Sequence, residues 1–489
     1  MSTSSAPIER RRTALRRTSL SKPVAVALAD GLLTPHTSVF DYGCGRGGDI
    51  ERLRWLGYEA AGWDPAFSPS TAKQAAHAVN LGYVINVIED AGERADTLRA
   101  AWDLTRSVLI VAARLAEQAK IRHATGHLDG LVTSRRTFQK LFTQEELRAW
   151  IDDTLGVRSI AAAPGIFYIF RADEAAQRYL ASRFRRQVAA PRVRTSEQTF
   201  EAARSLLAPL MGFFAARGRL PRPHELEGSE ALIEHFGSLR AAFALVKRVT
   251  GAAQWQTIVA ECHRDLLVYL ALVAFHRRPA FSTLPEELQY DIRDLFGTYK
   301  AACMAADELL FSAGHAEDID LACRTATVGK LTPEALYIHG STLASLPPLL
   351  RVYEGCARAL VGTVEGANVL KLNRRDARVS YLSYPGFERD PHPPLHSAVV
   401  ASLSRLRVDF RDYSESANPP ILHRKEALVA ADHPLREKFA RLTTQEERFG
   451  LFADPKMIGT KAGWTEALAQ AGVRLRGHRV LRVRPSTAK

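Results

Sequence analysis

The sequence predicts a doubly wound, Rossmann-like α/β domain at the N-terminal end, followed by a helical domain and an α+β C-terminal domain. Three observations lead to this fold class. A β-prone segment breaks into a glycine-rich turn and continues with helical periodicity, and strands and helices then alternate up to about residue 172. The 489 residues suffice for about three domains, and a composition with 46% hydrophobic and 24% charged residues excludes wholesale disorder.

The first strand, turn and helix have the pattern of a nucleotide-binding crossover. Residues 37–42 are β-prone, residues 43–48 are rich in glycine, and residues 49–56 show helical periodicity. A second predicted strand ends on Asp64, 21 positions after Gly43. Glycines let the backbone turn tightly and approach a ligand, while the following helix presents free N–H groups. A carboxylate at the end of the second strand can accept hydrogen bonds from ribose hydroxyls. The segment therefore predicts a βαβ unit.

The glycines alone leave the ligand open, because Gly43, Gly45 and Gly48 also fit the dinucleotide pattern G-x-G-x-x-G. Asp41 lies at the end of the first strand, where a carboxylate attracts a cationic amino acid but repels a pyrophosphate. No second mononucleotide-binding half follows. These features favour S-adenosylmethionine (SAM) over NAD(P), with a structural turn that binds no ligand as the third alternative.

Further elements continue the α/β alternation. They are a helix over residues 22–31, a buried strand running into a loop over residues 78–88, a helix over residues 91–104, a strand over residues 107–112, a helix over residues 142–155 and a closing strand over residues 165–170. A doubly wound sheet over about residues 23–172 accounts for all of them.

Positive charge is in excess, since 66 Lys and Arg residues face 53 Asp and Glu residues, for a formal net charge of +13. Three segments concentrate it: an arm over residues 1–22, which is expected to be mobile, a linker over residues 176–194, and a tail from residue 471 onward. Each segment alone can be a solvated surface. Three of them at predicted domain edges favour phosphate binding, so DNA is the first partner to expect.

The cysteines are scattered and form no C-x-x-C pair, so neither a disulfide framework nor a metal site is expected. Cys44, within the glycine turn, is interpreted as a loop-packing residue rather than a nucleophile. No segment reaches the ~18 apolar residues that a membrane helix needs, which predicts a soluble, cytoplasmic protein. The five cysteines are Cys44, Cys262, Cys303, Cys323 and Cys356.

Residues 41–47, Asp-Tyr-Gly-Cys-Gly-Arg-Gly, resemble the first motif of class I SAM-dependent methyltransferases. More specifically, the chain resembles the DNA phosphorothioation-associated methyltransferases, bacterial proteins encoded near the machinery that replaces a DNA phosphate oxygen with sulfur. The segments that carry this resemblance are residues 40–49, 62–65, 80–90, 137–140, 381–385 and 418–426. The resemblance implies a SAM fold, a role in DNA modification or phage defence, and phosphorothioation-system proteins as further partners.

The methyltransferase resemblance also implies roles for individual residues. Asp41 would meet the methionine amino end of SAM, Gly43, Gly45 and Gly47 would form the cofactor loop, and Asp64 would bind the ribose.

One departure from the methyltransferase pattern affects the adenine pocket. Only 11 residues lie between Pro65 and His77, too few for a full helix and a third strand. The carboxylate that usually follows the third strand and meets the adenine amino group therefore has no counterpart.

DNA amino-methyltransferases carry the catalytic signature D/N-P-P-Y/F after the fourth strand of their fold. The corresponding position here, within the segment 78–88, reads Asn80-Leu81-Gly82-Tyr83 and lacks both prolines. Asn80 and Asn86 are candidates to position an acceptor by hydrogen bonding, and Tyr83 to stack on a flipped base. A structural role for Asn80 and core packing for Tyr83 remain the alternatives. The literal Asn-Pro-Pro at residues 418–420 is far away and is interpreted as a rigid turn.

Five segments are expected along the chain: the arm, a SAM methyltransferase-like domain over residues 23–175, the linker, a helical domain over residues 195–360 and the α+β domain with a basic tail over residues 361–489. The leading hypothesis is a methyltransferase acting on DNA or on something bound to it. One alternative is a DNA-binding accessory protein with a non-catalytic SAM fold. Another is a methyltransferase for a small molecule or a protein.

Overall fold

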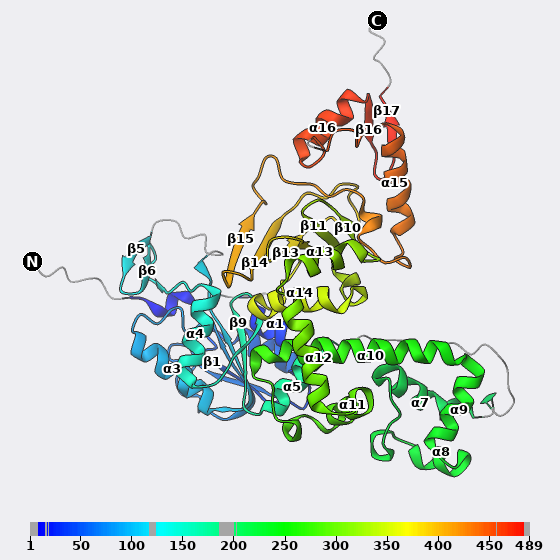
Figure 1. Cartoon of the computed structure of the whole chain (residues 1–489). Coiled ribbons are helices and arrows are strands. Elements are labelled where there is room, and N and C mark those ends of the chain that lie inside the picture. Colours follow the sequence, from blue (N-terminus) through cyan, green and yellow to red (C-terminus); the bar gives the residue numbers. More distant parts are fainter. Residues whose placement is uncertain are drawn as a thin grey trace, which may run out of the picture. The chain divides into compact units, whose positions relative to one another are not determined.

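The computed structural model describes residues 8–14, 17, 19–116, 124–184, 200–201, 203–455 and 457–483. The chain divides into two compact units (Figure 1). The first comprises Met1–Arg171, Asp320–Leu346 and Glu354–Lys489, and the second comprises Ala172–Ile319 and Pro347–Tyr353.

A six-stranded sheet in the first unit confirms the predicted doubly wound fold. Its strand order is β2 (Ala60–Trp63), β1 (Val39–Tyr42), β3 (Ala76–Gly82), β4 (Thr105–Ala112), β9 (Ile166–Phe170) and β8 (Ile160–Ala163). The first four strands are parallel, whereas β9 runs antiparallel to β4 and β8 antiparallel to β9. The chain moves outward from β1 to β2 and returns to β3 on the other side of β1. This reversal places a ligand crevice outside the carboxyl ends of β1 and β3.

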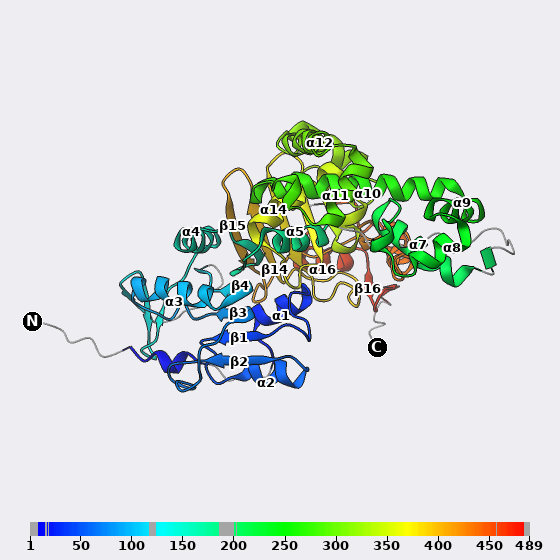
Figure 2. The ribbon, with the colours of Figure 1, turned by 90° about the horizontal axis from the view of Figure 1, so that it is seen from below.

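Helices cover this sheet and are visible beside it in Figure 2. They are α1 (Lys22–Ala29), α2 (Gly48–Trp55), α3 (Ala91–Asp103) and α4 (Gln144–Leu155). One face of the sheet forms a buried core with α3 and α4, whose members include Phe40, Leu81, Leu98, Ile151 and Phe167. Helix α1 packs on β3 and β4, and Figure 1 shows it on the opposite side of the strands from α3 and α4.

Two parts of this domain were not predicted. Strand β8 extends the sheet beyond the closing strand, and a separate small sheet is formed by β5 (Ala124–His127), β6 (Gly130–Thr133) and β7 (Phe138–Gln139). Strands of two to four residues are too short to show a clear alternation of apolar and polar side chains. The connection from β2 to β3 contains no regular helix or strand, as its length predicted.

The prediction that the N-terminal arm is mobile is wrong for residues 8–14, because they are folded against the domain. Arg10–Thr13 form the short 3-10 helix η1. The Arg10 guanidinium donates to Glu89 at 2.8 Å and to both carboxylate oxygens of Glu93 at 2.5 and 2.7 Å. The Glu9 amide donates to the Arg136 carbonyl oxygen at 2.8 Å. Residues 1–7, 15, 16 and 18 lie outside the described part of the chain.

A second six-stranded sheet in the first unit is antiparallel throughout. Its order is β10 (Lys330–Leu331), β11 (Ala335–His339), β12 (Val369–Asn373), β13 (Arg378–Ser383), β14 (Ser397–Ser402) and β15 (Arg407–Asp412). The remaining elements are η6 (Gly340–Ser345), η7 (Lys425–Ala427), α15 (Arg436–Arg448), α16 (Lys461–Gln470), β16 (Val473–Leu475) and β17 (Val480–Arg482). Helices α13 (Ala316–Thr325) and α14 (Pro348–Val361) each span a border between the units.

Strands β10 and β11 correct the boundary predicted at residue 360, because they belong to the second sheet although they lie within the predicted helical domain. Strand β11 pairs with β10 and with β12, which begins 30 residues after β11 ends at His339. The β11–β12 pairing, which is distant in sequence, joins these two short strands to the larger sheet, so local periodicity does not reveal it.

The second unit is helical. It contains α5 (Asp173–Ser182), α7 (Arg204–Arg217), α8 (Ser229–Phe236), α9 (Leu239–Thr250), α10 (Ala252–Val273), α11 (Glu286–Phe296), α12 (Tyr299–Ser312) and the short 3-10 helices η3 (Pro223–Glu225), η4 (Ala274–His276) and η5 (Phe281–Thr283). Helix α5 corrects the predicted linker, because residues 176–182 are helical and bury Tyr179 and Leu180. Residues 185–194 of that linker and residues 484–489 of the tail lie outside the described part.

We expect Thr143→Ala to lower the free energy of unfolding by about 0.5 to 2 kcal/mol, because it removes the N-terminal cap of α4. The Thr143 hydroxyl accepts from the Glu146 amide at 3.1 Å, and the Glu146 carboxylate accepts from the Thr143 amide at 3.3 Å. Urea unfolding followed by circular dichroism measures the loss. Thr154→Ala, the same change inside α4, should leave stability equal or slightly higher. Equal stability of both variants would contradict the cap.

Candidate functional site

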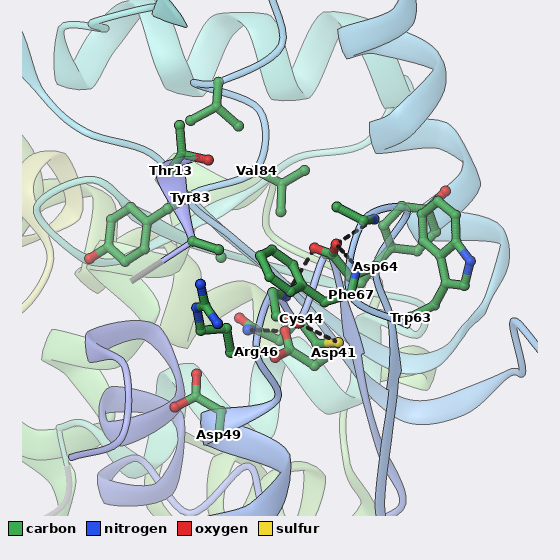
Figure 3. A pocket seen from close by; sticks show the side chains of 18 of the residues that line it. Thr13, Asp41, Cys44, Arg46, Asp49, Trp63, Asp64, Phe67, Tyr83 and Val84 are labelled. Carbon is green, nitrogen blue, oxygen red and sulfur yellow. Dashed lines mark hydrogen bonds between the residues drawn. The ribbon is translucent and has the colours of Figure 1, made fainter. Parts of the chain in front are cut away.

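A cavity of about 610 Å³ lies at the carboxyl ends of β1, β2 and β3. Its wall combines the glycine loop, the residues that follow β2 and β3, and the folded segment around η1. Figure 3 shows side chains from these segments around the cavity. This position is the crevice that the strand order predicts for a ligand.

The glycine loop bends through three residues in the left-handed region, with φ of 83° at Gly43, 52° at Gly45 and 75° at Gly47. A Cβ atom on Gly43 would lie 2.4 Å from Cγ2 of Val84, so this position requires glycine on steric grounds as well. Of the three glycines expected in the cofactor loop, Gly43 and Gly45 line the cavity, whereas Gly47 does not and instead caps α2. Gly48 takes its place in the wall.

The Asp64 carboxylate fastens the glycine loop to the segment after β2. Its Oδ2 atom accepts from the Gly45 amide at 3.0 Å, and its Oδ1 atom accepts from the amides of Ala66 at 2.8 Å and Phe67 at 3.1 Å. A carboxylate has about four acceptor positions, so these contacts leave room for one more hydrogen bond from the cavity that Asp64 lines.

Asp41 and Asn80 form a buried polar pair in the floor of the cavity. The two residues face each other across the β1–β3 pairing, and the Asn80 amide donates to Oδ1 of Asp41 at 2.8 Å. Their exposed fractions are 6% and 2%. Burial raises the pKa of Asp41 to about 7, the nearby carboxylate of Asp49 adds to this, and the Asn80 hydrogen bond opposes it. The Oδ1 atom of Asn80 has no hydrogen-bond donor among the described residues.

Tyr83 lines the cavity directly after β3, with φ of 63°. A left-handed conformation is unfavourable for an aromatic residue and is typical of functional sites. The Tyr83 amide donates to the Ala112 carbonyl oxygen at 2.8 Å, which holds the turn. The Arg17 guanidinium lies 5.6 Å from the ring centroid. Burial raises the pKa of the Tyr83 phenol, so the hydroxyl stays protonated at neutral pH.

The structure separates Asn86 from the other two candidates for catalysis. Asn86 is not part of the cavity wall, and its side-chain amide donates to Oε1 of Gln139 at 3.2 Å. The Lys140 amide donates to its carbonyl oxygen at 2.8 Å. The chain turns at Tyr83, which directs Asn86 toward the segment that follows β6. A catalytic role for Asn86 is therefore not retained.

Two other sequence interpretations concern Asn418 and Cys44. The Asn418 side chain accepts from the Ala462 amide at 2.8 Å in the first turn of α16, so the Asn-Pro-Pro segment is a structural turn. Burial raises the pKa of the Cys44 thiol to about 12, which disfavours the nucleophilic thiolate.

Sequence reasoning missed part of the wall. The η1 segment contributes Thr13 and Ala14, and a Cβ atom on Gly45 would lie 3.2 Å from that of Ala14. The basic composition of the arm was visible, but nothing local indicated that it folds over the glycine loop. An apolar part of the wall was also missed, formed by Phe67, Val84, Val87 and Ile88.

Within the described residues, no group of three or more His, Cys, Asp or Glu side chains could hold a metal ion. No helix in the described ranges is both long and apolar enough to cross a membrane.

No family model and no curated protein sequence matches the chain. Among solved structures, it is similar to a sugar N-methyltransferase from a Streptoalloteichus species, with 16% identity over 31% of this chain and 86% of that chain and a TM-score of 0.25. It is also similar to the 1,6-didemethyltoxoflavin N1-methyltransferase of Burkholderia thailandensis, solved with S-adenosylhomocysteine, with 14% identity, 30% and 77% coverage and a TM-score of 0.22.

A third similar structure is the magnesium protoporphyrin IX methyltransferase of Synechocystis, with 14% identity over 33% of this chain and 93% of that chain and a TM-score of 0.22.

We expect the stability of the ligand-free Asp41→Asn variant, relative to that of the wild type, to rise as the pH rises from about 4 to about 7. The raised pKa means that the folded state binds the Asp41 proton more tightly than the unfolded state does, so the contribution of Asp41 to wild-type stability falls over this interval. Each unit of pKa shift corresponds to about 1.4 kcal/mol.

Thermal unfolding of both proteins between these pH values tests this expectation. The exposed Asp96→Asn variant on α3 is the control and should show no such trend. A difference between Asp41→Asn and the wild type that does not change with pH would show that Asp41 has an ordinary pKa.

Proposed function

We propose that the chain is a SAM-dependent methyltransferase that acts on DNA or on a molecule bound to DNA. The observation that carries the cofactor assignment is the buried Asp41 carboxylate beside the free Oδ1 atom of Asn80, below the glycine loop. A buried carboxylate with a raised pKa and an acceptor without a donor fit a cationic ligand. The ammonium group of SAM has three N–H donors and a positive charge, so it can donate hydrogen bonds to both the Asp41 carboxylate and Oδ1 of Asn80.

The rest of the cavity fits the other parts of SAM. Gly43 and Gly45 allow the ligand to approach the backbone, and Asp64 has one acceptor position for a ribose hydroxyl. A second hydrogen bond from the ribose would have to replace one of the three amides that Asp64 holds. The apolar wall at Phe67 and Val84 offers contact for an adenine ring in place of the missing third strand. A pyrophosphate, as in NAD(P), would be repelled by Asp41.

SAM supplies an electrophilic methyl group when it is bound. In this chain, Tyr83 stands at the carboxyl end of β3, and its protonated hydroxyl can donate a hydrogen bond to an acceptor. Asn80 acts through Asp41, because its amide is already engaged there. Positioning of the acceptor is then the main contribution of the protein, since alignment of two reactants can lower a barrier by about 7 to 11 kcal/mol.

DNA as the acceptor, or as the site to which the acceptor is bound, is supported by the net charge of +13 and by the resemblance to the phosphorothioation-associated methyltransferases. A role in bacterial DNA modification or phage defence, in the cytoplasm and beside phosphorothioation proteins, belongs to the same proposal. A DNA-binding accessory protein without activity is the second candidate. The engagement of Asn80 with Asp41 favours it, because the amide is then not free to polarise a target amine.

We expect Asp64→Ala to weaken SAM binding by at least about 10-fold, because hydrogen bonds to a charged group contribute about 1.5 to 3 kcal/mol. Gly45→Val should weaken it as well, since φ of 52° disfavours valine and Ala14 leaves little space. Isothermal titration calorimetry with SAM measures both affinities, and Asp96→Ala on α3 is the matched control. Wild-type affinity in both variants would rule out SAM in this cavity.

We expect Tyr83→Ala to lower methyl transfer by at least about 10-fold while SAM affinity stays nearly unchanged, because the variant loses a contact to the acceptor rather than to the cofactor. Transfer from labelled SAM to phosphorothioated and to plain DNA is the assay. Thermal unfolding recorded in parallel separates this outcome from a folding defect. Wild-type turnover in both Tyr83→Ala and Asn80→Ala would remove this segment from the mechanism, and no turnover in the wild type would favour the accessory protein.

A further inference from the structure

The cavity has an acidic floor and a basic rim. Asp41, Asp49 and Asp64 line the interior. The exposed charged side chains of the wall are Arg11, Arg17 and Arg46, together with Glu51 and with Glu93, which is paired with Arg10. We propose that these three arginines bind a phosphate group of the methyl acceptor next to the atom that is methylated. The proposal rests on the proposed methyltransferase function and specifies its substrate as a phosphate-bearing molecule.

The first argument is that the rim arginines differ from their neighbours in having no acidic partner. Among the described residues, Arg11, Arg17 and Arg46 form no ion pair. The neighbouring Arg10 is neutralised by two glutamates, and Arg12 bonds to Glu9 at 2.6 Å. Unpaired guanidinium groups that converge on one cavity create a local positive potential, which attracts an anion.

The second argument is that two of the rim arginines are held by aromatic rings. The Arg17 guanidinium lies 5.6 Å from the Tyr83 ring centroid, and that of Arg46 lies 4.8 Å from the Phe67 ring centroid. Figure 3 shows Arg46 next to Phe67. A ring contact restricts the guanidinium plane and leaves its N–H edge free, and that edge matches phosphate oxygens bidentately. Because Tyr83 lies where the acceptor is expected, Arg17 is the rim arginine next to the acceptor position.

The third argument concerns the alternative that the rim serves the cofactor. SAM has one carboxylate, which one guanidinium can bind in a bidentate manner. Three exposed arginines exceed that need, so at least part of the rim faces another anion. A phosphate beside the reacting atom supplies it, and both a DNA strand and a small phosphate ester contain this group.

Fluorescence anisotropy with a labelled duplex of about 20 base pairs tests the rim, in the presence of saturating S-adenosylhomocysteine and at about 50 to 200 mM salt. Arg11→Gln, Arg17→Gln and Arg46→Gln should each reduce the slope of log K against log salt by about 0.9, the value for one phosphate contact on duplex DNA. Arg12→Gln is the matched control, because Arg12 lies next to Arg11 in η1 but does not line the cavity. Its slope should equal that of the wild type.

A second arm uses a deoxynucleoside monophosphate as the probe and measures its affinity by calorimetry in the same variants. Weaker nucleotide binding with unchanged duplex binding supports the phosphate rim and identifies a small phosphate ester as the acceptor. Unchanged duplex slopes and unchanged nucleotide affinities in all three variants would overturn the proposal. Titration of the wild type with SAM separates the failure of the proposed function from the failure of the phosphate-binding rim. If the wild type does not bind SAM, the methyltransferase function is refuted, whereas the phosphate-binding rim is tested by the arginine variants.

Discussion

A carboxylate buried at the point where the strand order reverses is the constraint on which the site depends. Asp41 can sit in β1 at 6% exposure because Asn80, on the adjacent strand β3, donates one hydrogen bond to it. That single neutral donor does not compensate the loss of water around a charge. The pKa of Asp41 is therefore raised to about 7 by burial. The fold thus holds an unfavourable group at the floor of its cavity, as is typical of sites that await a counter-charge.

The residues of the site come from two kinds of position, within a strand and directly after the end of a strand. Asp41 and Asn80 belong to the rigid sheet, whereas Asp64 and Tyr83 stand where β2 and β3 have just ended. Groups within the sheet are placed accurately by backbone pairing, and groups beyond it are placed by turns that need glycine or a left-handed residue. Tyr83 is such a left-handed residue, with φ of 63°. A β conformation at this residue would continue β3 instead of turning the backbone at the cavity.

Local sequence patterns indicated the crossover, the glycine turn and the positions of Asp41 and Asp64 along the chain, because each belongs to a short motif in or beside a strand. The Asp41–Asn80 pairing depends on which strands are neighbours, and Asn86 was misplaced because the turn at Tyr83 redirects the chain toward Gln139. The η1 wall depends on an ion pair between residues 83 positions apart. Contacts at such separations leave no periodic signal, and neither do strands as short as β7.

The fastening of η1 also has a consequence for the order of events during synthesis. Arg10 leaves the ribosome before its partners, since Glu89 and Glu93 follow 79 and 83 residues later. At about 5 to 20 residues per second, this delay is on the order of several seconds. During this time Arg10 lacks its two carboxylate partners, so the wall around η1 can be fastened to the domain only after residue 93 has been made. Any fragment that ends before residue 89 keeps the glycine loop but has lost the means to close one of its walls.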